Sequence, residues 1–210
     1  MRLPLILHPG SDCGAASAIE VDVRREAPRQ LSLRFVAFGP IRRLSLPRPS
    51  SAAPRRADEL WRHTCFEAFV RVGDETAYHE FNLSPSRDWA CYRFDDYRSG
   101  MADAKRVAPP RIETWLHYAQ VASERQRGRQ QDPAGTWRDF GEPFFELTAT
   151  LDMEHMLDLA VSEPWHLGLS AVIEERNGTK SYWALAHPTG QPDFHHRDCF
   201  ALELAAARPS

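Results

Sequence analysis

Several residues with ligand-type side chains lie at alternating positions in two neighbouring runs of the sequence. Glu67 lies in TCFEAFVRV, and Tyr78, Glu80 and Asn82 lie in the run that follows, AYHEFNL. Both runs alternate apolar and polar residues as half-buried strands do, and Gly73-Asp74 between them predicts a tight turn. Because neighbouring strands lie about 4.8 Å apart, side chains on one face of this hairpin can converge on a single ligand.

Aromatic residues around this hairpin complete a candidate ligand site. Trp61 precedes the first run, and a third predicted strand, WACYRF, follows the second. Flat aromatic faces and planar polar groups can together bind a small ligand. The structural alternative is that the tryptophans belong to the core and the carboxylates pair with arginines, because strands are rich in aromatics regardless of function. The predicted ligand-binding residues are Trp61, Glu67, Tyr78, Glu80, Asn82, Trp89, Tyr92 and Arg93.

Three stretches of the chain carry a family resemblance. LWRHTCFEAFV, YHEFNLSPSRDWACYRF and HPTGQPDFHHRDCFAL resemble the DOMON-like proteins related to family-9 carbohydrate-binding modules. The resemblance implies a ligand-binding β-sandwich, whose wider superfamily binds sugars or haem, but a fold alone does not fix a ligand. The positions that match residue by residue are Trp61, Glu67, Tyr78, Glu80, Asn82, Ser84, Trp89, His187, Asp193, Phe194 and His195.

Alternation along the rest of the chain predicts an all-β fold. We expect one domain, residues 1–210, folded as an antiparallel β-sandwich of the DOMON or jelly-roll kind with at most one or two short helices. One such helix is expected to begin at Asp152, and Ala122–Phe140 is expected to be a long flexible loop. Pro4 predicts that its strand lies at a sheet edge. The predicted strands are Leu3–Leu7, Ala18–Val23, Leu31–Phe35, Thr64–Val72, Ala77–Leu83, Trp89–Phe94, Ile112–Val121, Phe144–Leu151, Trp165–Ile173, Ser181–Ala186 and Cys199–Leu204.

The composition is that of an ordinary globular protein. Its 210 residues, 42% hydrophobic and 26% charged, suit one filled core better than two domains or a disordered chain. A net charge of -3 argues against nucleic acid or an anionic membrane as the partner. The start of the chain, MRLPLILHPGSD, lacks the longer apolar stretch of a signal peptide, and no run approaches the roughly 18 residues of a membrane helix. We therefore expect a cytoplasmic protein of undetermined oligomeric state.

Histidines near the C-terminus are the weak candidates for a metal site. His187, Asp193 and His195 carry ligand-type side chains. His195 and His196 would point to opposite faces if they lay in a strand, so they would not readily share one metal ion. A polar loop packed over the end of the sandwich is the favoured alternative.

No resident cofactor is expected. Calcium, held through the oxygens of Glu67 and Glu80, is the open alternative. The family resemblance implies a Met and a His as haem ligands, but nothing in the spacing singles out Met101 with His63 or His195. Haem is therefore disfavoured.

The motifs favour binding over catalysis. The sequence has no G-x-S-x-G elbow, P-loop, dinucleotide fingerprint or H-E-x-x-H motif. We expect a non-catalytic module that binds a small ligand, a carbohydrate or a related polyol. One alternative is an enzyme that acts on a sugar or cell-wall derivative through Glu67 and Glu80 as acid and base. Another is a protein-interaction module that uses an exposed sheet edge.

Overall fold

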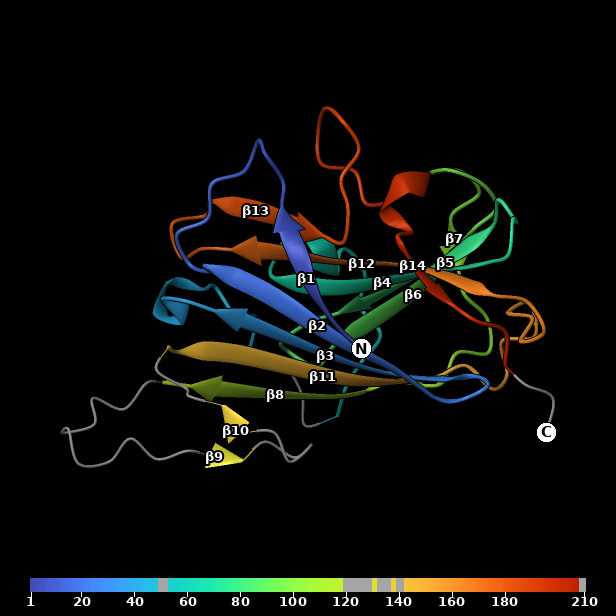
Figure 1. The fold of residues 1–210 in the computed structure, drawn as a ribbon, viewed down its shortest axis with the longest axis horizontal. Coiled ribbons are helices and arrows are strands. Elements are labelled where there is room, and N and C mark those ends of the chain that lie inside the picture. The colour runs from blue at the N-terminus through green and yellow to red at the C-terminus, as the bar shows by residue number, and fades with distance from the viewer. Residues whose placement is uncertain (49–52, 119–129, 132–136, 139–141, 208–210) are drawn as a thin grey trace.

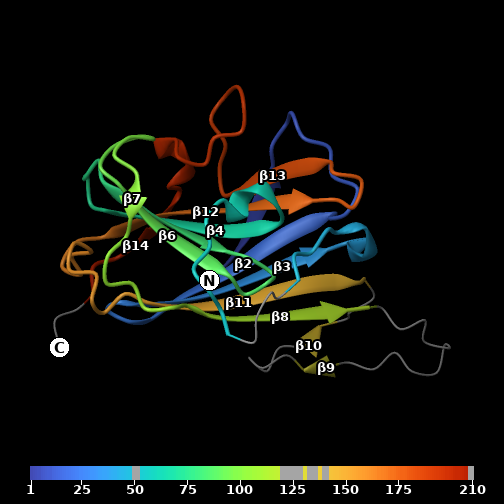
Figure 2. The same cartoon turned by 180° about the vertical axis from the view of Figure 1, so that it is seen from behind.

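Two antiparallel layers, called here sheets I and II and joined through β1 into one continuous sheet, form most of the protein, as the sequence predicts. The computed structural model describes residues 1–48, 53–118, 130–131, 137–138 and 142–207. Sheet I contains the first part of β1 (Arg2–Leu7), then β2 (Ala18–Ala27), β3 (Gln30–Phe38), β11 (Phe144–Asp152) and β8 (Arg111–His117), in that order. Sheet II contains the end of β1, then β13 (Lys180–Ala184), β12 (Trp165–Glu174), β4 (Cys65–Val72), β5 (Tyr78–Leu83), β6 (Trp89–Phe94) and β7 (Ala102–Asp103). Figures 1 and 2 show the two sheets from opposite sides.

Short elements complete the described part of the chain. β14 (Leu202–Leu204) pairs with the start of β12, and β9 (Gln130–Gln131) pairs with β10 (Trp137–Arg138). The helical elements there are single 3-10 turns: η1 (Ile41–Arg43), η2 (Leu60–Arg62) and η3 (Arg197–Cys199). The prediction of an all-β sandwich without long helices is therefore confirmed. Apart from β9 and β10, most of the predicted loop at 122–140 lies outside the described residues, as does the end of the strand predicted to reach Val121.

A continuous hydrophobic core fills the space between the sheets. Phe35 of β3 lies 5.1 Å from Phe66 of β4, and Phe66 stacks on Phe145 of β11 at 5.9 Å, both measured between ring centroids. The alternation of β4 and β5 sends Val70 and Phe81 into the same cluster. The opposite faces of β4 and β5 therefore point outward from the sandwich.

β1 joins the two sheets and is the outermost strand of each. Its residues 2–5 pair with β2, whereas Ile6 and Leu7 pair with β13. In Figure 1 the strand runs from the N-terminus in sheet I up to β13. Pro4 lies in the part that pairs with β2 alone, so one side of the strand there is unpaired and can accommodate a residue without an N–H. The edge prediction therefore holds at Pro4, and the strand joins the sheets only because Ile6 and Leu7 pair with β13 instead of β2.

The helix predicted from Asp152 is replaced by two successive turns. Asp152 is the last residue of β11, and its Oδ1 accepts a hydrogen bond from the Glu154 backbone N–H at 3.0 Å. Backbone bonds from Met156 to Met153 and from Leu159 to Met156 then close the turns. All three apolar side chains are buried in the core. Packing at every third residue thus takes the chain back to β12 without a helix.

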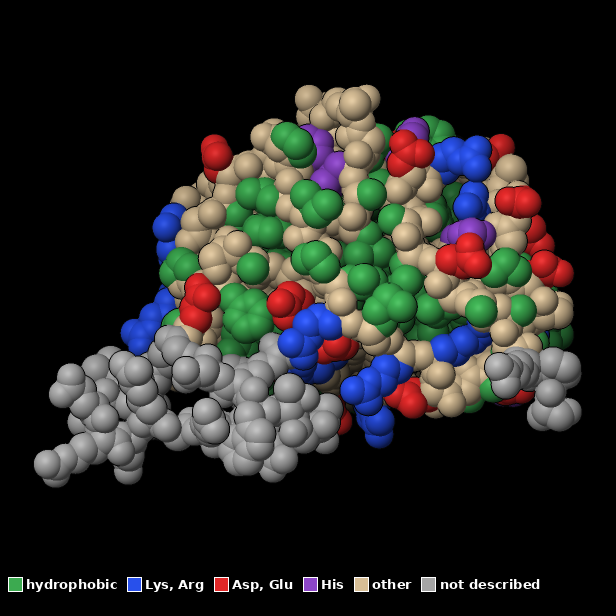
Figure 3. Space-filling model, viewed as in Figure 1, with side chains coloured by type: hydrophobic (Ala, Val, Ile, Leu, Met, Phe, Trp, Pro, Cys, Tyr) green, Lys and Arg blue, Asp and Glu red, His purple; other side chains and the backbone are tan. Residues whose placement is uncertain are grey.

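The outer face of sheet I neutralises its acidic groups with arginine. Arg34 of β3 donates to Asp22 of β2 and to Glu146 of β11. Figure 3 shows acidic and basic side chains adjoining one another in the lower part of that view, below a broad area of hydrophobic side chains. Such pairing is the usual way in which a carboxylate tolerates burial.

Gly39 should be intolerant of any side chain. Its φ is +125°, and a Cβ would lie 2.8 Å from the Ser17 backbone nitrogen. We expect Gly39→Ala to lower the free energy of unfolding by more than about 2 kcal/mol in urea denaturation. Gly178 is the matched control, because its φ of +86° is also left-handed but a Cβ there meets no atom within 4 Å. An equal loss in Gly178→Ala, which should cost only about 1 kcal/mol, would contradict a steric cause at Gly39.

Candidate functional site

The register of sheet II places polar side chains in rows across its outer face. The first row runs from β12 to β6 through Ser170, Glu67, Asn82 and Ala90. The second row runs through Gly168, Phe69, Glu80 and Tyr92. Glu67 and Glu80 are therefore diagonal neighbours on one face, as the alternation of the sequence predicts. We call these two residues the acidic pair.

Glu67 is buried and has one polar contact in the described chain. The residue is only 2% exposed. Ser170 Oγ donates a hydrogen bond to Glu67 Oε2 at 3.0 Å. The bonds of the described residues leave Oε1 of Glu67 without a hydrogen-bond partner. No basic side chain of the described residues lies within ion-pair distance of this carboxyl group.

Glu80 is held by the side chain next to it on the same face of β5. Glu80 is 5% exposed, and Asn82 Nδ2 donates to its Oε1 at 2.7 Å. The Oδ1 atom of Asn82 accepts only from the Cys65 thiol, at 3.5 Å. His195 Nε2 lies 3.8 Å from Glu80 Oε2, which is longer than a hydrogen bond. The acidic pair therefore retains acceptor capacity on both carboxyl groups.

Burial shifts the pKa values of this cluster toward the neutral forms. Burial, and then the charge of Glu80, raise the pKa of Glu67 to about 8. Burial raises the pKa of Glu80 to about 7, against the opposing effects of the Asn82 hydrogen bond and the Arg98 charge. Burial, followed by the charge of Arg98, lowers the pKa of His195 to about 4. At neutral pH His195 is uncharged, so it supplies no counter-charge to the acidic pair.

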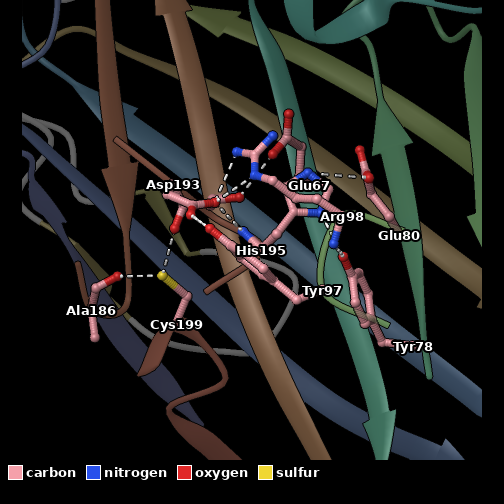
Figure 4. A network of polar contacts seen from close by, with 10 residues as sticks. Glu67, Tyr78, Glu80, Tyr97, Arg98, Ala186, Asp193, His195 and Cys199 are labelled. Carbon is pink, nitrogen blue, oxygen red and sulfur yellow. Dashed lines mark hydrogen bonds and ion pairs between the residues drawn. The ribbon is translucent and has the colours of Figure 1, made fainter. Parts of the chain in front are cut away.

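A loop from the C-terminal part of the chain covers this face. The segment, residues 185–201, is called here the C-terminal loop, and it lies beside β5 and β7 in Figure 1. His195 of this loop bonds through Nδ1 to the Tyr78 hydroxyl at 2.8 Å, and its ring contacts Phe69 and Phe94 edge-on. Figure 4 shows His195 between Tyr78 and Glu80. The loop thus closes over the acidic pair through one histidine.

An ion pair and a thiol fix the shape of the C-terminal loop. Asp193 Oδ1 accepts from Arg98 Nη2 at 2.8 Å and from Nε at 3.2 Å, and Tyr97 donates to its other oxygen. The Cys199 thiol is placed to donate to the carbonyls of Ala186, at 3.2 Å, and Asp193, at 3.1 Å. These contacts explain why the strand predicted from Cys199 begins only at Leu202. A surface cavity of about 550 Å³, lined in part by Tyr97, Arg98 and Asp193, adjoins the loop.

The structure brings together some of the predicted ligand-binding residues and separates others. Tyr92 lies on the face of the acidic pair, where its hydroxyl donates to Asp58 Oδ1 at 2.7 Å. Trp61 of η2 packs edge-on against Tyr92 at 5.9 Å between centroids. Trp89 instead lies in the core between the sheets, and Arg93, on the same opposite face, pairs with Asp158 and Asp95. The set on the outer face is Trp61, Glu67, Tyr78, Glu80, Asn82 and Tyr92.

Sequence reasoning missed two contributors to this face. Ser170 interrupts the apolar run LGLSAVI of β12, and a lone polar residue in such a run is a signal that it bonds to another buried polar group. Arg98 lies in a turn, and no sequence pattern connects it to Asp193. Its position follows only from the fold.

The weak metal candidates are occupied by other contacts. His187 bonds through Nε2 to the Ile6 carbonyl, whereas Asp193 and His195 hold the loop as described. In the described portion of the chain, no group of three or more His, Cys, Asp or Glu is arranged to hold a metal ion. Calcium at the acidic pair stays a prediction. Within the same portion, no helix is long and apolar enough to span a membrane.

A solved structure shares this fold. It is that of a candidate carbohydrate-binding protein from Bacteroides uniformis ATCC 8492, which aligns over 94% of this chain and 83% of its own with a TM-score of 0.53. The likeness shows the fold. Sequence identity is 12%, so it carries no residue-level assignment. No protein-family model and no curated protein matches the sequence.

Replacing Glu67 with glutamine should stabilise the protein at pH 8. Because the pKa of Glu67 is raised from 4.5 to about 8, the folded state binds more protons than the unfolded state between those values. Stability from this group is therefore full below pH 4.5 and is lost as pH rises toward 8. We expect Glu67→Gln to raise the free energy of unfolding by on the order of 1–2 kcal/mol at pH 8, with little change at pH 5, in urea denaturation.

Glu146→Gln is the matched control for this experiment. Glu146 is also buried but bonds to Arg34, so its neutralisation should destabilise the protein at pH 8. Destabilisation of similar size by both variants at pH 8 would show that interactions within the fold already stabilise the charge of Glu67, which would contradict this prediction.

Proposed function

We propose that the protein is a non-catalytic module that binds a small polyhydroxylated ligand, a carbohydrate or related polyol, at the acidic pair. The observation that carries this proposal is the unused acceptor capacity of buried carboxyl groups. No hydrogen bond from the described residues reaches Glu67 Oε1 or Glu80 Oε2, and neither oxygen is among the fully buried atoms without a partner, so both are open to a ligand. A ligand that donates hydrogen bonds would give both carboxyl oxygens a partner.

The surrounding side chains suit a sugar or polyol. Asn82 is oriented by its bond to Glu80 and still offers Oδ1, which accepts only a weak thiol bond. Tyr92 and Trp61 provide aromatic surface beside the polar row. Paired hydroxyls need such planar polar groups, and C–H surfaces need such aromatic faces.

Access to the acidic pair depends on the C-terminal loop. The His195 ring approaches Glu80 without a hydrogen bond, so the ligand displaces a contact that contributes little. Among the described residues, the bond from His195 to Tyr78 is the one hydrogen bond of that ring with sheet II that a ligand would have to break or rearrange.

Two further considerations support the proposal. The sequence resembles DOMON-like proteins related to family-9 carbohydrate-binding modules over the strands that carry the acidic pair. The solved structure with the same fold is described as a candidate carbohydrate-binding protein. Both are similarities, and neither identifies the ligand of this chain.

Trp61→Ala should weaken saccharide binding by about 5- to 20-fold, because one aromatic face contributes on the order of 1–2 kcal/mol to such contacts. Calorimetry with hits from a glycan array measures this loss. Trp115→Ala is the control, since Trp115 is a partly exposed tryptophan on β8 of the other sheet and should leave affinity unchanged. Failure of every saccharide to bind the wild-type protein, or equal affinities of the two variants, would contradict the proposal.

The raised pKa of Glu67 favours one second candidate, an enzyme that acts on glycosides. A carboxyl group with a pKa of about 8 is protonated at neutral pH, as a general acid must be. Turnover of chromogenic glycosides that is lost in Glu67→Gln would support this candidate. If the wild type binds saccharides but turns over no glycoside, the enzyme candidate is excluded and the binding module is supported.

A further inference from the structure

The acidic pair is an exception to the way this protein buries carboxylates. The buried acidic residues of the described chain are Glu67, Glu80, Asp88, Glu146 and Glu175. The last three pair with arginine: Asp88 with Arg55 at 3.9 Å, Glu146 with Arg34, and Glu175 with Arg43 at 2.9 Å. Glu67 and Glu80 have no arginine or lysine partner among the described residues, and they lie on one face of one hairpin. Two buried carboxyl groups thus share one uncompensated site.

The described arginine whose charge acts on Glu80 is committed elsewhere. Arg98 acts on Glu80 through its charge, but its guanidinium donates two hydrogen bonds to Asp193. His195 Nε2 lies 3.8 Å from Glu80 Oε2. The ring is neutral because burial lowers the pKa of His195 to about 4. When the acidic pair ionises, its counter-charge therefore comes from outside the described chain.

The open acceptors match a primary ammonium group. Such a group has three N–H donors and no acceptor. Glu67 Oε1 and Glu80 Oε2 are two acceptors without partners, and Asn82 Oδ1 is a third with only a weak thiol bond. Tyr92 and Tyr78 flank these atoms on the same face, and aromatic surroundings add cation–π attraction.

A divalent cation fits this site less well. Calcium takes 6–8 oxygen ligands, whereas the face offers two carboxyl groups and one amide oxygen. Within the described residues no cluster of three acidic, histidine or cysteine side chains could hold a metal ion. The chemistry of the site therefore favours an organic cation.

We propose that the ligand of this face carries a protonated primary amine, bound between Glu67 and Glu80, and is an amino sugar or amino polyol. This inference rests on the proposed function, which explains how the hydroxyl groups of the ligand are bound. It adds that the ligand also carries an amine. The ammonium group supplies the counter-charge that arginine supplies at the other buried carboxylates.

Binding of an ammonium group should release a proton. Glu67, with a pKa of about 8, holds a proton at pH 7, and the arriving cation favours the ionised form. Glu80 contributes in the same direction. The titratable and charged groups that face the acidic pair from the surrounding elements are Cys65, Arg71, Tyr78, Tyr92, Arg98, Asp193 and His195. His195 stays neutral and the tyrosines and thiol stay protonated at pH 7, so release is assigned to the pair.

Calorimetry with matched probe pairs tests the inference. Glucamine is compared with sorbitol, and glucosamine with glucose, at pH 7 in two buffers that differ in ionisation enthalpy. We expect an amine to bind at least tenfold more tightly than its hydroxyl counterpart, with release of about one proton per ligand. Glu67→Gln and Glu80→Gln should reduce the preference for the amine to less than about threefold, whereas Glu146→Gln should retain it.

The outcomes separate this inference from the proposed function. Equal or tighter binding of sorbitol or glucose would overturn the amine and leave the polyol-binding function intact. Binding of butylamine as tight as that of glucamine would support the amine and contradict the polyol. No binding by any probe, or binding of calcium that glucamine does not displace, would overturn the inference.

Discussion

The outer face of sheet II is dominated by the cost of burying two carboxyl groups without a cation. An ionised carboxylate in a low-dielectric site loses far more solvation than one hydrogen bond returns. Elsewhere the chain meets this cost with arginine, as at Glu146 and Glu175. At Glu67 and Glu80 it is met by protonation, which raises both pKa values. Binding and catalytic sites often contain such unfavourably buried groups, because the groups that activity requires can lower the stability of the fold.

The rest of the architecture positions and encloses that face. β4 and β5 bury Phe66, Val70 and Phe81 in the core, so strict alternation directs the acidic pair outward. β12 adds Ser170 from one side, and η2 adds Trp61 from another. The C-terminal loop then places His195 over the pair, whose residues are only 2% and 5% exposed. Because the loop is itself fixed by the bond of Asp193 to Arg98, the covering segment and sheet II form one connected network.

Period-two alternation made much of the fold predictable from the sequence. It placed the hairpins of β2 with β3 and of β4 with β5, and it put Glu67 and Glu80 on one face. The same rule separates Tyr92 from Trp89 and Arg93, so the predicted grouping of all three was inconsistent with the alternation that supported it. The switch of β1 between sheets, the turns after Asp152 and the approach of His195 to Glu80 depend on tertiary packing. Local pattern carries no information about these contacts.

Carbon-13 NMR titration of the glutamate side-chain carboxyl groups shows whether the acidic pair is buried without compensation. Spectra of wild type, Glu67→Gln and Glu80→Gln between pH 3 and 9 would assign the two resonances. Since the two groups interact, the wild type should show two apparent transitions that belong to the pair. We expect midpoints near 8 and 7, well above the 4.5 of an ordinary glutamate. Two midpoints near 4.5 would show that the fold already compensates both charges and that the pair is not the uncompensated site proposed here.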